Sequence, residues 1–224
     1  SFGDKKLSEI AISVPGSTSL LREYDLDFCC GGADTLGAAV AEKNLNLAEI
    51  EARLTELQES KQQDDEQRWL TAPYAEIIDH IIHRYHERHR AQLQELIVLA
   101  ERVESVHGDR DDCPVGVAAE LHNVYADLSS HMMKEEQILF PMIKMGNYAM
   151  ARMPIQVMEH EHAEHGEHLD VLKALTNNLT PPADACNTWR ALYSGIQEFM
   201  DDLMMHIHTE NNILFPRVIE EGSR

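Results

Sequence analysis

The sequence is poor in positive charge and in long apolar runs, and each shortage excludes a class of protein. Lys and Arg total 19 against 39 Asp and Glu, which gives a formal net charge of −20. Such an exterior would repel phosphate backbones and anionic membrane surfaces. No apolar run approaches the roughly 20 residues that a membrane-spanning helix needs. We therefore expect no nucleic acid and no membrane among the partners of this protein.

Cysteine is also scarce, and its spacing indicates no disulfide framework. The four residues are Cys29, Cys30, Cys113 and Cys186, and the adjacent pair cannot bond to each other without strain. Reduced thiols fit a reducing compartment. The N-terminal residues contain no hydrophobic stretch typical of a secretory signal. These observations predict a cytoplasmic location.

Turn-forming residues divide the chain into a small helical module and a larger domain. Residues 1–58 contain short helical patterns, interrupted by Pro15-Gly16 and by the run Cys29-Cys30-Gly-Gly. Residues 59–70 begin with a polar stretch that lacks an apolar period, and they are predicted to be a linker. The remainder, 71–220, is predicted to be the second domain.

Four long amphipathic patterns fill the second domain. Glycine and proline turns separate them. The predicted helices cover about 73–107, 114–146, 152–178 and 183–219. Helices of this length with short connections most simply form an up-down-up-down bundle. The predicted fold class is therefore all-α, a four-helix bundle preceded by a small helical module.

The second domain contains an internal repeat. The pattern His131-x3-Glu135-x2-Ile-Leu-Phe-Pro returns 75 residues later as His206-x3-Glu210-x2-Ile-Leu-Phe-Pro. Residues four apart lie one turn apart on the same face of a helix, so each copy presents an imidazole beside a carboxylate. Ile138 lies three residues after Glu135, on the same predicted apolar face of the helix. We therefore expect Ile138 to point inward together with the His131–Glu135 pair.

Each repeat has a histidine upstream at a similar distance. His86 lies 45 residues before His131, and His162 lies 44 residues before His206. The bundle is therefore interpreted as two copies of one helical hairpin.

The other histidines are not predicted to be metal ligands. His89 and His165 are expected in the core, hydrogen-bonded or beside the ligands. Six others fall outside the apolar faces of the predicted helices and are expected at the surface, namely His83, His107, His122, His160, His168 and His208, while the position of His80 is left open.

Four imidazoles and two carboxylates converging from four helices would form a site for two metal ions. A carboxylate in an apolar bundle is costly unless a cation compensates it. Nitrogen and oxygen donors without thiolate favour iron or manganese over structural zinc. If both glutamates and an oxo or hydroxo group bridge the ions, each ion has five donors. One position per ion would then be open to a small molecule.

The motifs resemble known families. The bundle from about 73 to 220 resembles the hemerythrin family. With Tyr24-Asp-x-Asp27-x-Cys29-Cys30-Gly-Gly in its first module, the whole chain resembles the Repair of Iron Centres proteins of the YtfE or ScdA type. This resemblance implies two non-haem iron ions, bridged by an oxo or hydroxo group and two glutamates. The ligands it implies are His86, His131, Glu135, His162, His206 and Glu210, of which Glu135 and Glu210 bridge.

The resemblance also implies a function, with alternatives that the sequence leaves open. We expect the repair of iron–sulfur clusters after nitrosative or oxidative damage, with damaged iron–sulfur proteins as partners and iron donation as the main role. Alternatives are reduction of nitric oxide to nitrous oxide, which would make the protein an enzyme, and an oxygen or nitric oxide sensor. Cys29 and Cys30 are either a tight turn at a helix start or reactive thiols. Monomer and homodimer both remain open.

Overall fold

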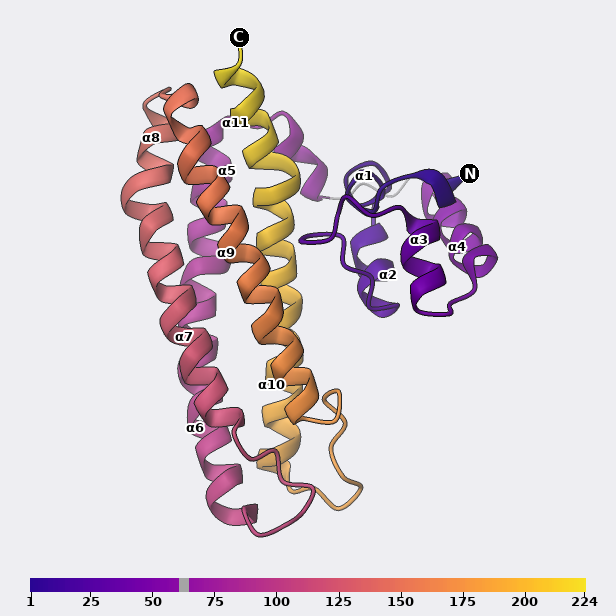
Figure 1. Cartoon of the computed structure of the whole chain (residues 1–224), viewed down its shortest axis with the longest axis vertical. Helices are drawn as coiled ribbons and strands as arrows, with labels where there is room; N and C mark the ends of the chain where they lie inside the picture. The colour runs from indigo at the N-terminus through magenta and orange to yellow at the C-terminus, as the bar shows by residue number, and fades with distance from the viewer. Residues whose placement is uncertain (61–64) are drawn as a thin grey trace. The chain divides into compact units, whose positions relative to one another are not determined.

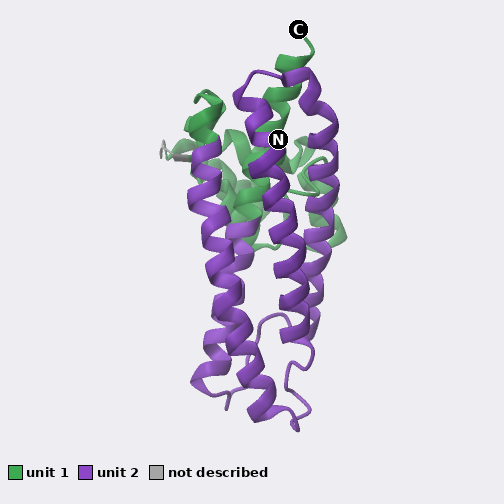
Figure 2. Cartoon of the chain, turned by 90° about the vertical axis from the view of Figure 1, so that its left-hand side faces the viewer, with its two compact units in different colours: residues 1–77, 204–224 green, residues 78–203 purple. Residues whose placement is uncertain are grey.

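The computed structural model of the chain describes residues 1–60 and 65–224, so the predicted linker at 59–70 falls partly outside the described residues. The chain divides into two compact units, residues 1–77 with 204–224, and residues 78–203 (Figure 2). The boundary at 203/204 falls inside helix α10, so that this helix contributes to both units. No helix among the described residues is long and apolar enough to cross a membrane.

The first unit contains a module of short helices. Side-chain caps begin two of them, because Thr35 accepts from the backbone N–H of Ala38 and Asn46 accepts from that of Glu49. Completely buried apolar residues, among them Leu21, form the core of the module. The helices are α1 (Leu7–Ser13), α2 (Ser17–Glu23), α3 (Leu36–Glu42) and α4 (Leu47–Glu59), with 3-10 helices at Phe2–Asp4 and Asp65–Leu70.

The four predicted long helices are present as continuous helical runs that lie side by side (Figure 1). Helix α7 packs against both α6 and α9. The fold is therefore the all-α bundle that the sequence predicts. The runs are α5 (Tyr74–His80) to α6 (Glu87–His107), α7 (Val117–Lys134) to α8 (Phe140–Lys144), α9 (Tyr148–Leu175), and α10 (Asn187–His208) to α11 (Phe215–Gly222).

Three of these runs contain a π-helical turn, at Ile81–His86, Glu135–Leu139 and Thr209–Leu214. A proline follows two of the turns, and it cannot donate to the carbonyl four residues earlier. The helix instead forms wider bonds, as from the N–H of Phe140 to the carbonyl of Glu135.

The wider turn rotates the residues that follow it. Leu139 and Phe140 are buried, whereas Ile138 is 53% exposed. The prediction that Ile138 points inward is therefore wrong, because a π-turn breaks the regular helical period on which it was based.

A buried carboxylate joins α6 to α10 in the second unit. Asp202 accepts hydrogen bonds from Arg84 at 2.9 Å, from Arg88 at 2.8 Å and from Gln92 at 2.9 Å. Burial alone would raise the pKa of Asp202, but these donors outweigh it and hold the pKa below its usual value. The network fixes the α6 segment that follows His86.

Candidate metal centre

The six side chains predicted as ligands lie in two overlapping groups. Within each group the ligand atoms lie within 4.8 Å of one another. One group is His86, Glu135, His206 and Glu210, and the other is His131, Glu135, His162 and Glu210. All six side chains are buried, with at most 1% of their surface exposed. Glu135 and Glu210 belong to both groups, so their positions suit carboxylates shared by two ions. Their role as metal ligands remains a prediction.

The π-helical turns carry three of these residues. His86 is the last residue of the first turn, Glu135 begins the second, and Glu210 lies in the third. A π-turn inside a long α-helix is uncommon and frequently marks a functional site, because it places an extra residue on the inner face. The remaining residues, His131, His162 and His206, come from regular turns of α7, α9 and α10.

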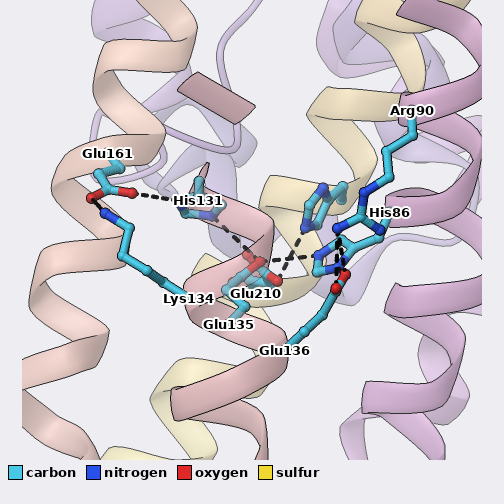
Figure 3. A network of polar contacts seen from close by, with 9 residues as sticks. His86, Arg90, His131, Lys134, Glu135, Glu136, Glu161 and Glu210 are labelled. Atoms are coloured by element: carbon cyan, nitrogen blue, oxygen red, sulfur yellow. Dashed lines mark hydrogen bonds and ion pairs between the residues drawn. The ribbon is translucent and has the colours of Figure 1, made fainter. Parts of the chain in front are cut away.

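An outer carboxylate holds His86 in place (Figure 3). The Nε2 atom of His86 lies 3.0 Å from Glu135 Oε1, while its Nδ1 atom lies 2.6 Å from Glu136 Oε2. Arg90 donates to both oxygens of Glu136 at 3.0 Å. The hydrogen bond from His86, with the charge of Arg90 beside it, holds the pKa of Glu136 below its usual value.

The same arrangement recurs at His131, whose outer carboxylate comes from α9. Its Nε2 atom lies 3.4 Å from Glu135 Oε1, and its Nδ1 atom lies 2.9 Å from Glu161 Oε1. Lys134 forms an ion pair with the other oxygen of Glu161, as Figure 3 shows. These contacts, that of His131 first, lower the pKa of Glu161 to about 2.

Glu136 and Glu161 were missed by the sequence analysis. Each is the direct neighbour of a predicted ligand, since Glu136 follows Glu135 and Glu161 precedes His162. Sequence proximity alone did not separate them from other acidic residues on the same helices. Their roles depend on which histidine of another helix they contact.

The donor set and its orientation fit metal binding. The nitrogen that faces Glu135 is Nε2 in both His86 and His131, and the opposite nitrogen donates to a carboxylate outside the site. This is the orientation that metal-binding histidines usually have, because the outer carboxylate fixes the ring and raises its basicity. Two carboxylates at 0% exposure are costly without a compensating cation. The residues therefore fit two cations that prefer nitrogen and oxygen donors, such as iron.

Neighbouring histidines have other roles. His89 and His165 are buried, as expected, and neither belongs to the two groups. His208 was expected at the surface, and this prediction is wrong, because only 1% of it is exposed. Its Nδ1 atom lies 2.8 Å from the amide nitrogen of Asn212, and its ring meets the Phe28 ring edge-on at 5.3 Å. The burial arises from a contact distant in sequence, which periodicity does not reveal.

The adjacent cysteines lie in a loop. Helix α2 ends at Glu23 and α3 begins only at Leu36, so neither cysteine lies at a helix N-terminus. A hydrogen bond with Cys30, burial and nearby negative charge raise the pKa of Cys29 well above its usual value. Reactivity of Cys29 and Cys30 remains a prediction.

Comparison with known proteins agrees with these features. Residues 77–218 match the hemerythrin HHE cation binding domain, and residues 3–58 match a domain of unknown function named ScdA_N. A probable iron-sulfur cluster repair protein of Haemophilus influenzae is 68% identical over 221 residues, which cover 99% of each chain. The iron-sulfur cluster repair protein YtfE of Musicola paradisiaca is 56% identical over 218 residues, which cover 97% of each.

These matches cover nearly the whole chain and include both parts that the sequence analysis distinguished. The hemerythrin match contains all six predicted ligands, and the ScdA_N match contains Cys29 and Cys30. The chain therefore belongs to the hemerythrin HHE family and, within it, to the YtfE-type Repair of Iron Centres proteins.

Proposed function

We propose that the chain holds two non-haem iron ions and takes part in the repair of iron–sulfur clusters damaged by nitrosative or oxidative stress. The observation that carries the proposal is the pair of buried groups that share Glu135 and Glu210. The names of the full-length relatives support the repair role. We propose that the two glutamates bridge the ions, together with an oxo or hydroxo group, and that damaged iron–sulfur proteins receive iron from the chain. The cytoplasm, a reducing compartment in which the cysteines of the chain would stay reduced, remains the predicted location.

The residues of the chain explain how such iron could be both held and released. Each group offers four donor residues, fewer than the six donors of an octahedral ion. Glu136 and Glu161 orient the histidines from outside, and both are partly exposed, at 26% and 18% of their side chains. Bound iron would supply positive charge and open coordination positions. The protein would contribute donor residues in fixed positions. The carboxylates that orient these donors, Glu136 and Glu161, would remain accessible to solvent.

The first test is metal content. Purified wild type is expected to contain about two irons per chain and to show ferric absorption. Glu135→Ala and His206→Ala should lose both signals. His122→Ala is a matched control, because His122 lies on the same helix as His131 but is exposed and pairs with Glu101. A chain without metal, or one that holds zinc, would contradict the proposed centre.

The second test is repair itself. Iron-loaded wild type is added anaerobically to a dehydratase whose iron–sulfur cluster has been damaged, and recovery of dehydratase activity is followed. We expect wild type and His122→Ala to restore activity and His131→Ala to fail. If wild type restores no more activity than His131→Ala, the repair role is rejected even where the iron content is correct.

Nitric oxide chemistry is the second candidate function. The observation that favours it is the number of donors, because four protein residues per group leave room for a small molecule at each ion. The test is anaerobic mixing of the diferrous protein with nitric oxide, followed by detection of nitrous oxide. Formation of nitrous oxide would make the protein an enzyme, and its absence would remove this candidate.

A further inference from the structure

A second cluster of side chains of the types that bind metals lies in the loop between α2 and α3. The ligand atoms of Asp27, Cys29 and Cys30 lie within 4.8 Å of one another, and both sulfur atoms are thiols. Asp27 Oδ1 accepts from the backbone N–H of Cys30 at 2.9 Å and from that of Cys29 at 3.2 Å. The same oxygen lies 3.4 Å from the sulfur of Cys29. The turn therefore fixes a carboxylate beside two thiols.

Two side chains from the π-helical turn at Thr209–Leu214 hold the backbone of this loop. Asn211 donates from its side-chain amide to the carbonyl of Cys29 at 3.0 Å, and Asn212 donates to that of Phe28 at 2.8 Å. A Cβ atom on Gly32 would lie 2.7 Å from the Phe28 carbonyl oxygen, so the loop has no room for a side chain there. The backbone that carries the two cysteines is thus held in place before any ligand binds, which lowers the entropy cost of binding.

The charge of the cluster favours a cation. The raised pKa of Cys29 arises from its hydrogen bond with Cys30, from burial, from the Cys30 sulfur close by, and from the negative charge of Asp27. A bound cation reverses these effects, because it offsets the repulsion and stabilises the thiolate. Asp27 and Cys30 are exposed, so the cluster is open to solvent on one side.

We propose that Asp27, Cys29 and Cys30 form a second metal site, which takes a thiophilic divalent transition-metal ion such as Fe²⁺ in an exchangeable way. Two sulfur donors and one oxygen donor suit such an ion better than Mg²⁺ or Ca²⁺. As the two metal–sulfur bonds form, Cys29 and Cys30 each release a thiol proton to solvent. Structural zinc sites are closed by four protein ligands. Three donors leave positions for water or for a thiolate of another protein.

The proposal does not depend on the function of the bundle, and its test uses the iron-loaded full-length chain. The protein is titrated anaerobically with Co²⁺, and the thiolate-to-cobalt charge-transfer absorption is recorded. Cobalt held by histidine and glutamate lacks this absorption, so the signal reports the cysteines alone. We expect the signal to saturate at about one Co²⁺ per chain, with release of protons. Iron content is measured in parallel.

Variants of the three proposed ligands, with a control cysteine variant, test whether these residues bind the cobalt. Cys30→Ser, at an exposed position, should abolish the absorption, as should Cys29→Ser. Asp27→Asn should weaken cobalt binding by about tenfold or more, since it removes the charged oxygen donor. Cys186→Ser is the control, because Cys186 is exposed and lies 3.3 Å from His107. Absence of the absorption in wild type, its persistence in Cys30→Ser, or its loss in Cys186→Ser would overturn the proposal.

Discussion

Replacement of Glu136 by glutamine should weaken the binding of one of the two proposed iron ions. Glu136 is not one of the predicted metal ligands. Its carboxylate lies 2.6 Å from Nδ1 of His86, a completely buried predicted ligand. Glutamine keeps the size of the side chain and removes the charge. The imidazole then loses the negative partner that fixes its ring and raises its basicity.

The size of the effect follows from the contact. A hydrogen bond to a charged group contributes about 1.5–3 kcal/mol, and loss of such an outer partner commonly weakens metal binding about 10- to 100-fold. Glu136 is 26% exposed and is shared with Arg90, so we expect the lower end, about tenfold or about 1.4 kcal/mol. The affected ion is the one assigned to the group of His86.

The assay is competition with an iron chelator, with the release of each ion followed over time and at equilibrium. Glu136→Gln should release one iron earlier than the other, while wild type releases both later. Glu87→Gln is the matched control, because Glu87 makes a similar 3.1 Å contact with Nδ1 of His83, an exposed histidine outside the site. An unchanged release, or an equal change in Glu87→Gln, would refute the reasoning.

Further predictions follow from other contacts. Glu161→Gln should weaken the other ion by a similar factor through His131, as the same chelator assay would show. Chelation of both ions should lower the Tm by about 10 °C in calorimetry, because binding at about 1,000 times Kd stabilises the fold by about 4 kcal/mol. Gly32→Ala should cost about 1–3 kcal/mol in denaturant unfolding, since the added Cβ has no room. Asp202→Asn should lower the free energy of unfolding above about pH 5, as measured by denaturant unfolding. Because the pKa of Asp202 is lowered in the folded protein, the difference in unfolding free energy between wild type and variant should shrink as the pH falls through that pKa.

The parts of the centre that were predictable depend on local helical geometry. His131 and Glu135 are four residues apart, so their shared face follows from the period of a helix, and the repeat at His206 and Glu210 made the pattern specific. The bundle itself follows from long apolar stripes joined by short turns.

Features that depend on contacts between helices were not predictable in this way. Glu136 and Glu161 acquire their roles only when α6 and α9 bring a partner beside α7. Ile138 was misplaced because a π-turn adds a residue to the period, and nothing but the following proline hints at it. His208 was misplaced because its partner, Phe28, lies far away in sequence.

The two repeats differ at the residue that follows the shared glutamate. In the first copy Glu136 supports a histidine of the centre, whereas in the second the corresponding Asn211 holds the carbonyl of Cys29. Asn211 lies in the same π-helical turn as Glu210. If Glu210 binds a metal as proposed, a shift of that turn on metal binding would also move the anchor of the cysteine loop. By thermodynamic reciprocity, a ligand that binds the loop and shifts the turn would then change metal affinity at Glu210 by the same factor.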